Sequence, residues 1–417
     1  MPDTPPNAHA LHHALIDLLK RQRVIRSATV ETAFRAVPRH RFLPTTPLEQ
    51  VYADAVVPTK FAGTEPISSS SQPSMMAIML EQGAFKPGQR VLEIGAGTGF
   101  NAALMSHMVG VRGQVTALDI DDDLIENARR ALSSVALPSP VVLHRADGWQ
   151  GYPDHAPYDR IILTVQAHDL APAWFDQLKD GGRLIVPLDV WAGAQFSVTF
   201  VKRRDHLVSA SVSPCGFMPL RGEAAAQAGE TAVNRDERLL VTQLQHTRPP
   251  AHTLESLRGL LEAPGRAWES GISAPAYRLH SSGFWLWLAA RAPDVIDIRA
   301  AQDKNGVETT LPMLFGKPGA WSQTYGLASV DGLALLYAVP FQKGDRTQTV
   351  RIGVRAWGDG SPLRRLMGAL RAWNAAGQPD SRSLRLAAFP GTLPPGKRLP
   401  PQVITLQKAQ FAYALKH

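Results

Sequence analysis

The sequence predicts an α/β domain built on a parallel sheet, followed by a smaller α+β domain. Between residues 86 and 190, five short apolar runs alternate with stretches of helical periodicity. That alternation is typical of a parallel sheet covered by helices on both faces. An Ala-, Gly- and Glu-rich stretch, residues 222–234, then interrupts the apolar pattern. Because a chain of 417 residues is long enough for two or three domains, we interpret this stretch as a linker.

The first 85 residues are predicted to be a helical segment with loops. Leu11, Leu15 and Leu19 recur at helical spacing, and Val30 and Phe34 belong to a second apolar stripe. Both stripes are typical of helices that pack against a core. We expect the loop that follows them to contribute to substrate and cofactor binding.

Residues 86–221 are predicted to form the sheet and its covering helices. The expected strands are 90–94, 114–119, 141–144, 159–163 and 183–186, and the expected helices are 98–109, 121–132 and 170–178. Two further strands, 194–202 and 206–212, are expected to form a hairpin about Arg203-Arg204-Asp205.

The remaining segment, residues 235–417, is predicted to be a separate α+β domain. It holds six of the nine tryptophans. Its patterns favour helices at 284–290 and 363–373, strands at 333–339 and 348–354, and a Pro-rich surface loop at 390–401. We expect this domain to recognise a peptide.

The net charge of +8 is distributed unevenly along the chain. Residues 1–230 hold 21 basic and 23 acidic side chains, a balance of −2, whereas residues 231–417 hold 23 basic and 13 acidic, a balance of +10. A basic second half favours an acidic partner.

The sequence carries few marks of a metal site, a disulfide or a membrane anchor. The single cysteine, Cys215, cannot form an internal disulfide, which fits a reducing compartment. No apolar run is long enough for a membrane span, so we expect a cytoplasmic protein without a membrane partner. His9, His12 and His13 are interpreted as exposed helix positions rather than metal ligands, and no metal is expected.

A Gly-rich motif lies between the first expected strand and the first expected helix of the sheet. It reads Glu93-Ile94-Gly95-Ala96-Gly97-Thr98-Gly99. Glycines at such a turn let the backbone approach a ligand closely. Asp119 ends the next strand, where a carboxylate can accept both ribose hydroxyls. Asp147-Gly148 follows the third strand, where a carboxylate can contact an adenine amino group.

These strand ends predict a nucleoside pocket at one edge of the sheet. The dinucleotide fingerprint G-x-G-x-x-G is a close competitor, but the spacing here is G-x-G-x-G. An acid at position 93 disfavours a dianionic pyrophosphate and suits the cationic sulfonium and amino groups of S-adenosylmethionine. We therefore predict S-adenosylmethionine as the cofactor and S-adenosylhomocysteine as its product.

Several segments resemble the protein-L-isoaspartate O-methyltransferase family. The matching segments are 36–42 (AVPRHRF), 67–74 (ISSSSQPS), 87–95 (PGQRVLEIG), 146–148 (ADG), 181–187 (GGRLIVP) and 217–220 (FMPL). The resemblance covers about residues 30–221. It implies a Rossmann-like S-adenosylmethionine-dependent methyltransferase domain, with an extra β-element that ends near Pro219-Leu220. The long chain resembles the actinobacterial peptide-aspartate methyltransferases, which carry a C-terminal addition.

The resemblance also implies roles for individual residues. The family's essential serine lies in a Ser-(Ala/Gln)-Pro context, which Ser71 matches, although the run Ser68–Ser71 leaves open which serine is essential. The residues implied to bind the cofactor are Gln72, Ser74, Glu93, Gly95, Gly97, Gly99, Asp119, Asp147 and Gly148. Those implied to bind the substrate are Ser70, Thr164, Pro187, Leu188, Pro219 and Leu220.

The chemistry of a carboxylate acceptor needs few catalytic groups. A side-chain carboxylate is already ionised at neutral pH, so it needs no general base. A hydroxyl such as that of Ser71 can orient it. The segment 163–167 (LTVQA) lacks the Asn/Asp-Pro-Pro-aromatic element of nucleobase N-methylation. His168 and Asp169 could serve a hydroxyl acceptor as a base, but we interpret them as a solvated loop pair.

Three functions remain open from the sequence. The first is esterification of an aspartyl side chain in a dedicated ribosomal peptide, which leads to an aspartimide. The second is general repair of isoaspartyl residues in damaged proteins. The third, from another class, is nucleic-acid binding through the basic, Trp-rich second half, with a vestigial cofactor domain. The sequence does not give the oligomeric state.

Overall fold

The computed structural model divides the chain into two compact units. Unit 1 comprises Met1–Asp189, Gln195–Ala228 and Arg385–Lys416, and unit 2 is essentially Gly229–Leu384. The residues that the structure describes are 7–191, 194–223, 232–235, 239–243, 259–261, 263–279, 282–292, 294–301, 314, 321–339, 349–394 and 403–416. Most of the predicted linker, residues 224–231, lies outside them, and its last three residues belong to a strand.

Five parallel strands form the centre of unit 1, as the alternating pattern predicted. They are β3 (Arg90–Ile94), β4 (Gln114–Asp119), β5 (Val141–Arg145), β6 (Tyr158–Leu163) and β7 (Leu178–Trp191). Their order is β5-β4-β3-β6-β7 and all are parallel, so successive strands are added on one side of β3 up to β5 and on its other side from β6 on. In open α/β sheets, ligands bind at such a switch in strand order, beyond the carboxyl ends of the strands.

Helices follow the strands at the predicted places. They are α5 (Phe100–Val109), α6 (Asp122–Ser133) and α7 (Pro172–Gln177), with short 3₁₀ turns η2 (Gly148–Gln150) and η3 (Pro153–His155). Both α5 and α6 pack against β4. Helix α5 is buried along nearly its whole length because its sequence, FNAALMSHMV, is apolar on every side.

The N-terminal segment folds into helices, as predicted. It also contains one hairpin, which the sequence patterns did not predict. The elements are α1 (Ala8–Arg21), α2 (Ala28–Ala36), η1 (Arg39–Phe42), α3 (Leu48–Val51), hairpin strands β1 (Val57–Ala62) and β2 (Glu65–Ser70), and α4 (Pro73–Gly83). The stripes of α1 and α2 enter the core with α5, as expected of packing helices. One interpretation was wrong: His12 is buried and its ring bonds the Phe34 carbonyl at 2.7 Å.

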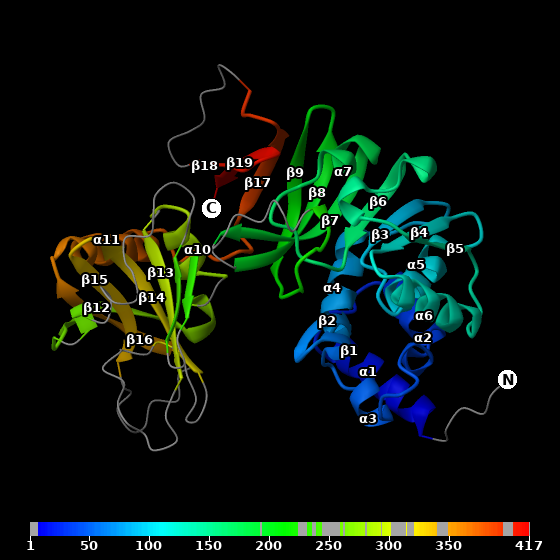
Figure 1. Cartoon of the computed structure of the whole chain (residues 1–417), viewed down its shortest axis with the longest axis horizontal. Helices are drawn as coiled ribbons and strands as arrows, with labels where there is room; N and C mark the ends of the chain where they lie inside the picture. The colour runs from blue at the N-terminus through cyan, green and yellow to red at the C-terminus, as the bar shows by residue number, and fades with distance from the viewer. Residues whose placement is uncertain are drawn as a thin grey trace. The chain divides into compact units, whose positions relative to one another are not determined.

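The chain end returns to unit 1, which the sequence did not predict. The hairpin β8 (Ala194–Arg203) and β9 (His206–Pro214) extends the sheet, and β17 (Arg385–Pro390) pairs antiparallel with β9. Strands β19 (Phe411–Lys416) and β18 (Ile404–Gln407) complete ten strands. In Figure 1 these last strands are coloured orange to red; β17 lies beside β9, and β19 and β18 follow it outward. Unit 2 is therefore an insertion within unit 1 rather than a tail.

Asp169 fastens this returning segment to the central sheet. Its buried carboxylate accepts hydrogen bonds from the Gln410 and Phe411 amides at 2.7 and 3.3 Å and from the Tyr413 hydroxyl at 2.6 Å. Lys408 donates to the carbonyls of His168 and Asp189. The interpretation of His168 and Asp169 as a solvated loop pair was therefore wrong for Asp169. Its carboxylate is buried and hydrogen-bonded to residues 410–413.

Unit 2 is built on an antiparallel sheet of seven strands, in agreement with the predicted α+β class. Their order is β10-β11-β13-β14-β15-β16-β12. The bounds are β10 (Ala232–Arg235), β11 (Leu239–Gln243), β12 (Arg266–Pro275), β13 (Val295–Ala301), β14 (Trp321–Ser329), β15 (Gly332–Val339) and β16 (Thr349–Gly358), with η4 (Ala276–Arg278), α10 (Phe284–Ala289) and α11 (Ser361–Ala375).

Four tryptophans of unit 2 belong to its core. Trp285, Trp287, Trp357 and Trp373 are all buried, whereas Trp268 is 37% exposed. Buried indoles cannot stack on bases, so these four side chains offer no support to the nucleic-acid hypothesis. Across the described residues, no helix is long and apolar enough to cross a membrane.

Candidate active site

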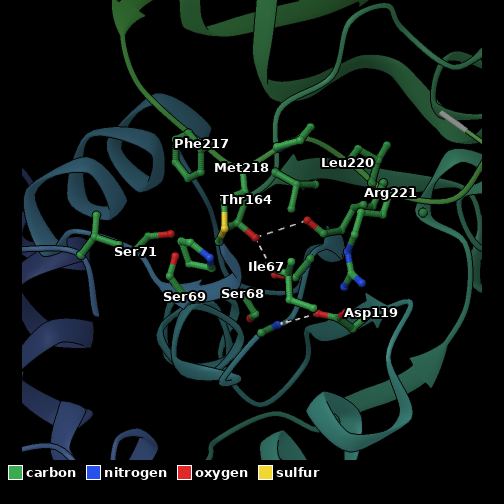
Figure 2. A pocket seen from close by; sticks show the side chains of 18 of the residues that line it. Ile67, Ser68, Ser69, Ser71, Asp119, Thr164, Phe217, Met218, Leu220 and Arg221 are labelled. Atoms are coloured by element: carbon green, nitrogen blue, oxygen red, sulfur yellow. Dashed lines mark hydrogen bonds between the residues drawn. The ribbon is translucent and has the colours of Figure 1, made fainter. Parts of the chain in front are cut away.

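A cavity of about 490 Å³ opens at the carboxyl ends of β3, β4 and β6. The β1–β2 hairpin lines one side of it, and the segment from Pro214 to Arg221 lines another. Figure 2 shows Ser69 and Ser71 at one end of the cavity and Asp119 with Arg221 at the other. The volume suits a ligand of the size of a nucleoside with a short side chain.

The glycine loop forms the floor of this cavity. Gly95 and Gly97 both line it, and their φ angles are +91° and +53°. At Gly95 a Cβ atom would lie 2.9 Å from the Thr164 Oγ1 atom, so a side chain would displace that hydroxyl. The Thr164 hydroxyl donates to the Gly95 carbonyl at 2.5 Å and fixes the loop. Gly99 does not line the cavity; it caps α5 and packs closely on α6.

Asp119 lies at the end of β4 with its carboxylate at the cavity wall. One oxygen accepts from the Gly97 amide at 2.9 Å and the other from the Ile120 amide at 2.8 Å. Burial raises the pKa of Asp119, while these amides act in the opposite direction. The second of these oxygens also accepts a long hydrogen bond, of 3.4 Å, from the Asp121 amide. The carboxylate can therefore still accept hydroxyl donors from a ligand in the cavity.

Asp121 connects two walls of the cavity. Arg221 donates to both of its oxygens, at 2.7 and 3.3 Å, and Lys60 of the β1–β2 hairpin lies 3.0 Å from one of them. The Arg221 guanidinium is the main cause of the lowered pKa of Asp121. These ion pairs tie the hairpin and the 214–221 segment to the start of α6.

The serine run lies at the far end of the cavity from Asp119. Ser68, Ser69 and Ser71 line the cavity, whereas Ser70 is buried outside its lining.

Gln72 also lines the cavity and donates to the Asp54 carbonyl at 3.1 Å. Ser74, predicted to bind the cofactor, is instead held at its amide by the Asp54 carboxylate at 2.8 Å and does not line the cavity.

Residues 10–225, just over half of the chain, match the family model described as protein-L-isoaspartate(D-aspartate) O-methyltransferase. The chain belongs to this family. It is thus an S-adenosylmethionine-dependent protein carboxyl O-methyltransferase, and the predicted cofactor is confirmed. The narrower peptide-modifying subtype of the sequence analysis has no support from this match.

Related proteins carry the same family name. The protein-L-isoaspartate O-methyltransferase of Hyperthermus butylicus is 38% identical over 218 residues, which cover 50% of this chain and 88% of the relative. That of Methanopyrus kandleri is 34% identical over 223 residues, 52% of this chain and 94% of the relative. A solved structure titled protein-L-isoaspartate O-methyltransferase aligns with 90% of this chain and 96% of its own, with 26% identity and a TM-score of 0.49.

Glu93 of the methyltransferase lies behind the glycine loop rather than in the large cavity. It is fully buried, and one carboxyl oxygen accepts from the Asn101 amide at 2.7 Å. Burial raises the pKa of Glu93 to about 8, so the carboxyl is mostly protonated at neutral pH. The electrostatic argument from a charged Glu93 was therefore wrong in its premise, and direct contact with the cofactor stays a prediction.

Asp147 also points away from the cavity of the methyltransferase. Its carboxylate accepts from the Trp149 amide at 2.9 Å and from the Glu223 amide at 2.8 Å. Its neighbours Ala146 and Gly148 line the cavity instead. At Gly148 a Cβ atom would lie 2.2 Å from an Ile94 methyl group, so glycine is required there. Contact between Asp147 and adenine stays a prediction.

The structure brings together only some of the predicted substrate residues. Thr164, Pro219 and Leu220 line the cavity. Pro187 and Leu188 do not; they support the loop after β6, where the Ala167 amide donates to the Pro187 carbonyl at 2.8 Å and Ala167 forms an isolated bridge with Leu188. Residue Pro219 forms an isolated β-bridge with Gln166, which is the extra β-element that the family resemblance implied.

Sequence reasoning missed the two cations that bind Asp121. Lys60 lies in a hairpin that the apolar pattern did not reveal, and Arg221 immediately follows the predicted Pro219-Leu220 pair. The available signal for these cations was the run of three acids at residues 121–123. Acids at the start of a helix interact favourably with the helix dipole, and they also attract cationic side chains. In the described part of the chain, no three His, Cys, Asp or Glu side chains cluster as metal ligands.

Proposed function

We propose that this methyltransferase esterifies the side-chain carboxylate of isoaspartyl residues in peptides and damaged proteins. The observation that carries the proposal is the composition of the cavity wall. Among the described residues that line it, the only acid is Asp119, and there is no histidine or lysine. A site without a general base suits an acceptor that is already ionised.

The cofactor end of the cavity is formed by the glycine loop and Asp119. Gly95 and Gly97 leave room for a ligand against the backbone, and Asp119 offers acceptors to the ribose hydroxyls. When bound, S-adenosylmethionine supplies an electrophilic methyl group. The apolar side chains of Phe217, Met218, Pro219 and Leu220 line the cavity, and apolar walls of this kind disfavour water around the reacting groups.

The acceptor end is formed by hydroxyl groups. We assign to Ser71 the donation of one hydrogen bond to the carboxylate oxygen that does not react. The other carboxylate oxygen would then be aimed at the methyl group that bound S-adenosylmethionine would supply, with the electron pair of the broken carbon–sulfur bond retained by sulfur. Proximity and orientation supply the rate gain because no proton is transferred.

The product ester explains why such a reaction corrects isoaspartate. The methoxy group of the ester leaves, as methanol, more readily than an oxygen of the ionised carboxylate does. The next backbone amide can therefore attack the ester carbonyl and close a succinimide. Hydrolysis of that ring regenerates normal aspartate in part of the molecules. Repeated cycles therefore convert isoaspartyl residues to aspartyl residues.

The second candidate function is esterification of a dedicated peptide substrate. Under both hypotheses we propose a cytoplasmic location. The observation that favours it is the insertion of unit 2, which a compact catalytic unit does not need. Residues 231–417 carry the +10 balance that led us to expect an acidic peptide. Part of that charge belongs to residues 385–416, which complete the catalytic sheet, so the argument for a separate recognition domain is weaker than the sequence indicated.

The test uses three synthetic peptides that differ at one position, which is isoaspartate, aspartate or asparagine. We expect base-labile methyl incorporation from labelled S-adenosylmethionine into the isoaspartyl peptide alone. Methylation of a matched aspartyl peptide, with none of the isoaspartyl peptide, would favour the dedicated-substrate function. Incorporation into none of the three by protein that binds S-adenosylhomocysteine would contradict the proposed function.

A further inference from the structure

A buried arginine lies directly beneath the serine run. Arg39 of η1 is 1% exposed, yet its guanidinium bonds only oxygens of the backbone and of one serine. The acceptors are the carbonyls of Val51 (2.8 Å), Ser71 (3.0 Å), Ala53, Ala55 and Ser70 (3.4 Å each), and the Ser70 hydroxyl (3.2 Å). One side chain thus joins the loop 51–55 to the end of β2.

Arg39 remains a cation although it is enclosed. Burial lowers the pKa of Arg39 to about 10, which is well above neutral. Asp54 is the acid that acts on Arg39 electrostatically, but among the described residues no carboxylate forms an ion pair with the guanidinium. A buried charge without a paired carboxylate is costly unless hydrogen bonds compensate for the lost water. The cation therefore fixes the positions of these carbonyl groups, and the carbonyl groups in turn stabilise the cation.

This arrangement decides which way Ser70 and Ser71 face. Successive residues of an extended chain point to opposite sides. Because the Ser70 hydroxyl is bound to Arg39 and the Ser71 carbonyl is fixed by the same guanidinium, the Ser71 side chain is left to face the cavity. Asp54 supports the next residues, as it accepts from the Ser74 amide and, through its carbonyl, from Gln72.

We propose that Arg39 is a positioning residue for methyl transfer, which aims the Ser71 hydroxyl at the acceptor carboxylate. The inference rests on the proposed function. Arg39 does not line the cavity, so it acts through Ser70 and Ser71 rather than on the substrate. Lysine cannot replace it, because an ammonium group has three donors and no planar fork to reach the two segments at once.

Arg160 provides a matched control in the same unit. It is also buried, at 7% exposed, and its guanidinium bonds the carbonyls of Gly83 (2.6 Å), Asp159 (2.8 Å) and Ala84 (3.1 Å). Burial lowers the pKa of Arg160 to about 10, as for Arg39. Arg160 does not line the cavity and has no bond to the serine run. Replacing either arginine by lysine thus disturbs similar chemistry at different places.

The experiment compares Arg39→Lys and Arg160→Lys with the wild type. We measure kcat and KM for the isoaspartyl peptide, together with the calorimetric affinity for S-adenosylhomocysteine. Arg39→Lys is expected to lower kcat by roughly tenfold to a hundredfold, since a small misplacement of an orienting group has that effect. Its affinity for S-adenosylhomocysteine should stay within about twofold of the wild type, and Arg160→Lys should keep the wild-type kcat.

An unchanged kcat in Arg39→Lys would overturn the inference, as would equal losses in both variants, which indicate a general structural role. Where Arg39→Lys does not fold, Ser70→Ala gives the same comparison, because Ser70 bonds Arg39 and does not line the cavity. A lowered kcat with unchanged S-adenosylhomocysteine affinity supports the inference, and a wild-type kcat refutes it. Wild-type protein without activity on the isoaspartyl peptide would instead refute the proposed function.

Discussion

Asp119 is the residue on which cofactor binding most depends. Its carboxylate is already oriented by the backbone amides of Gly97, Ile120 and Asp121, so it can meet a ligand without rearrangement. We predict that Asp119→Ala weakens S-adenosylhomocysteine binding by about tenfold to a hundredfold, because hydrogen bonds to a charged group contribute about 1.5–3 kcal/mol. Titration calorimetry measures the change. Asp122→Asn, an exposed acid at the start of α6, is the control and should leave the affinity unaltered.

At Ser71 we expect a substitution to affect catalysis rather than cofactor binding. Ser71→Ala should keep the affinity for S-adenosylhomocysteine and lower kcat for the isoaspartyl peptide by about tenfold, since one orienting hydrogen bond is lost. Alanine variants of Ser68 and Ser69, which also line the cavity, resolve which serine of the run is essential. Full activity in Ser71→Ala with a loss in either neighbour would move the role along the strand.

The buried carboxyl of Glu93 gives a pH-dependent prediction. Its pKa is raised from 4.5 to about 8 in the folded protein, so the folded state keeps a proton that the unfolded state loses between these values. Stability from this group is full below the unfolded pKa and is lost as the pH rises towards 8. The stability of the wild type relative to Glu93→Gln should therefore fall between about pH 5 and 8, by at most about 5 kcal/mol.

Urea unfolding of both proteins at several pH values measures this difference. Glutamine is neutral at all of these pH values and similar in shape, so it serves as the reference for protonated Glu93. A difference that stays constant, or grows, with pH would mean that Glu93 is ionised in the folded state.

At the scale of elements, the returning strands β17–β19 stabilise the catalytic sheet. Asp169→Asn leaves one oxygen where a carboxylate now serves three donors from residues 410–413. Leaving buried donors without a partner costs about 1–3 kcal/mol, so the free energy of unfolding should fall by that amount. Denaturant titration measures it. Asp205→Asn, on the exposed turn between β8 and β9, should change stability far less.

Local sequence patterns predicted the elements that carry the cofactor but not their long-range partners. The five parallel strands and the Asp119 position followed from periodicity and from where each strand ends. The pairing of β17 with β9 did not, because Leu386 and Ser209 meet although they are 177 positions apart. The direction of Glu93 and Asp147 was also beyond local patterns, since both depend on which neighbour the side chain contacts after folding.

Arg39 shows a similar limit of sequence reasoning. It belongs to the segment 36–42 that supported the family resemblance, yet no spacing rule predicts a guanidinium whose partners are carbonyl groups. Backbone acceptors have no residue identity, so such a cluster becomes visible only when the loops are folded.

At the scale of the whole molecule, the two units are expected to be separable. Replacing residues 229–384 by a short flexible linker keeps all segments of unit 1. We predict that this variant unfolds cooperatively and binds S-adenosylhomocysteine as the full chain does. A chain ending at residue 228 lacks β17–β19 as well and should unfold at lower denaturant concentration. Equal stability of the two shortened chains would contradict the role assigned to the returning strands.

The central claim is that one edge of the parallel sheet holds the methyl donor between Asp119 and the serine run. A crystal structure with S-adenosylhomocysteine tests it most directly. We predict that both ribose hydroxyls bond the Asp119 carboxylate and that the sulfur atom faces the Ser69–Ser71 end of the cavity. A nucleoside bound elsewhere, or one with its sulfur turned away from these serines, would contradict the account.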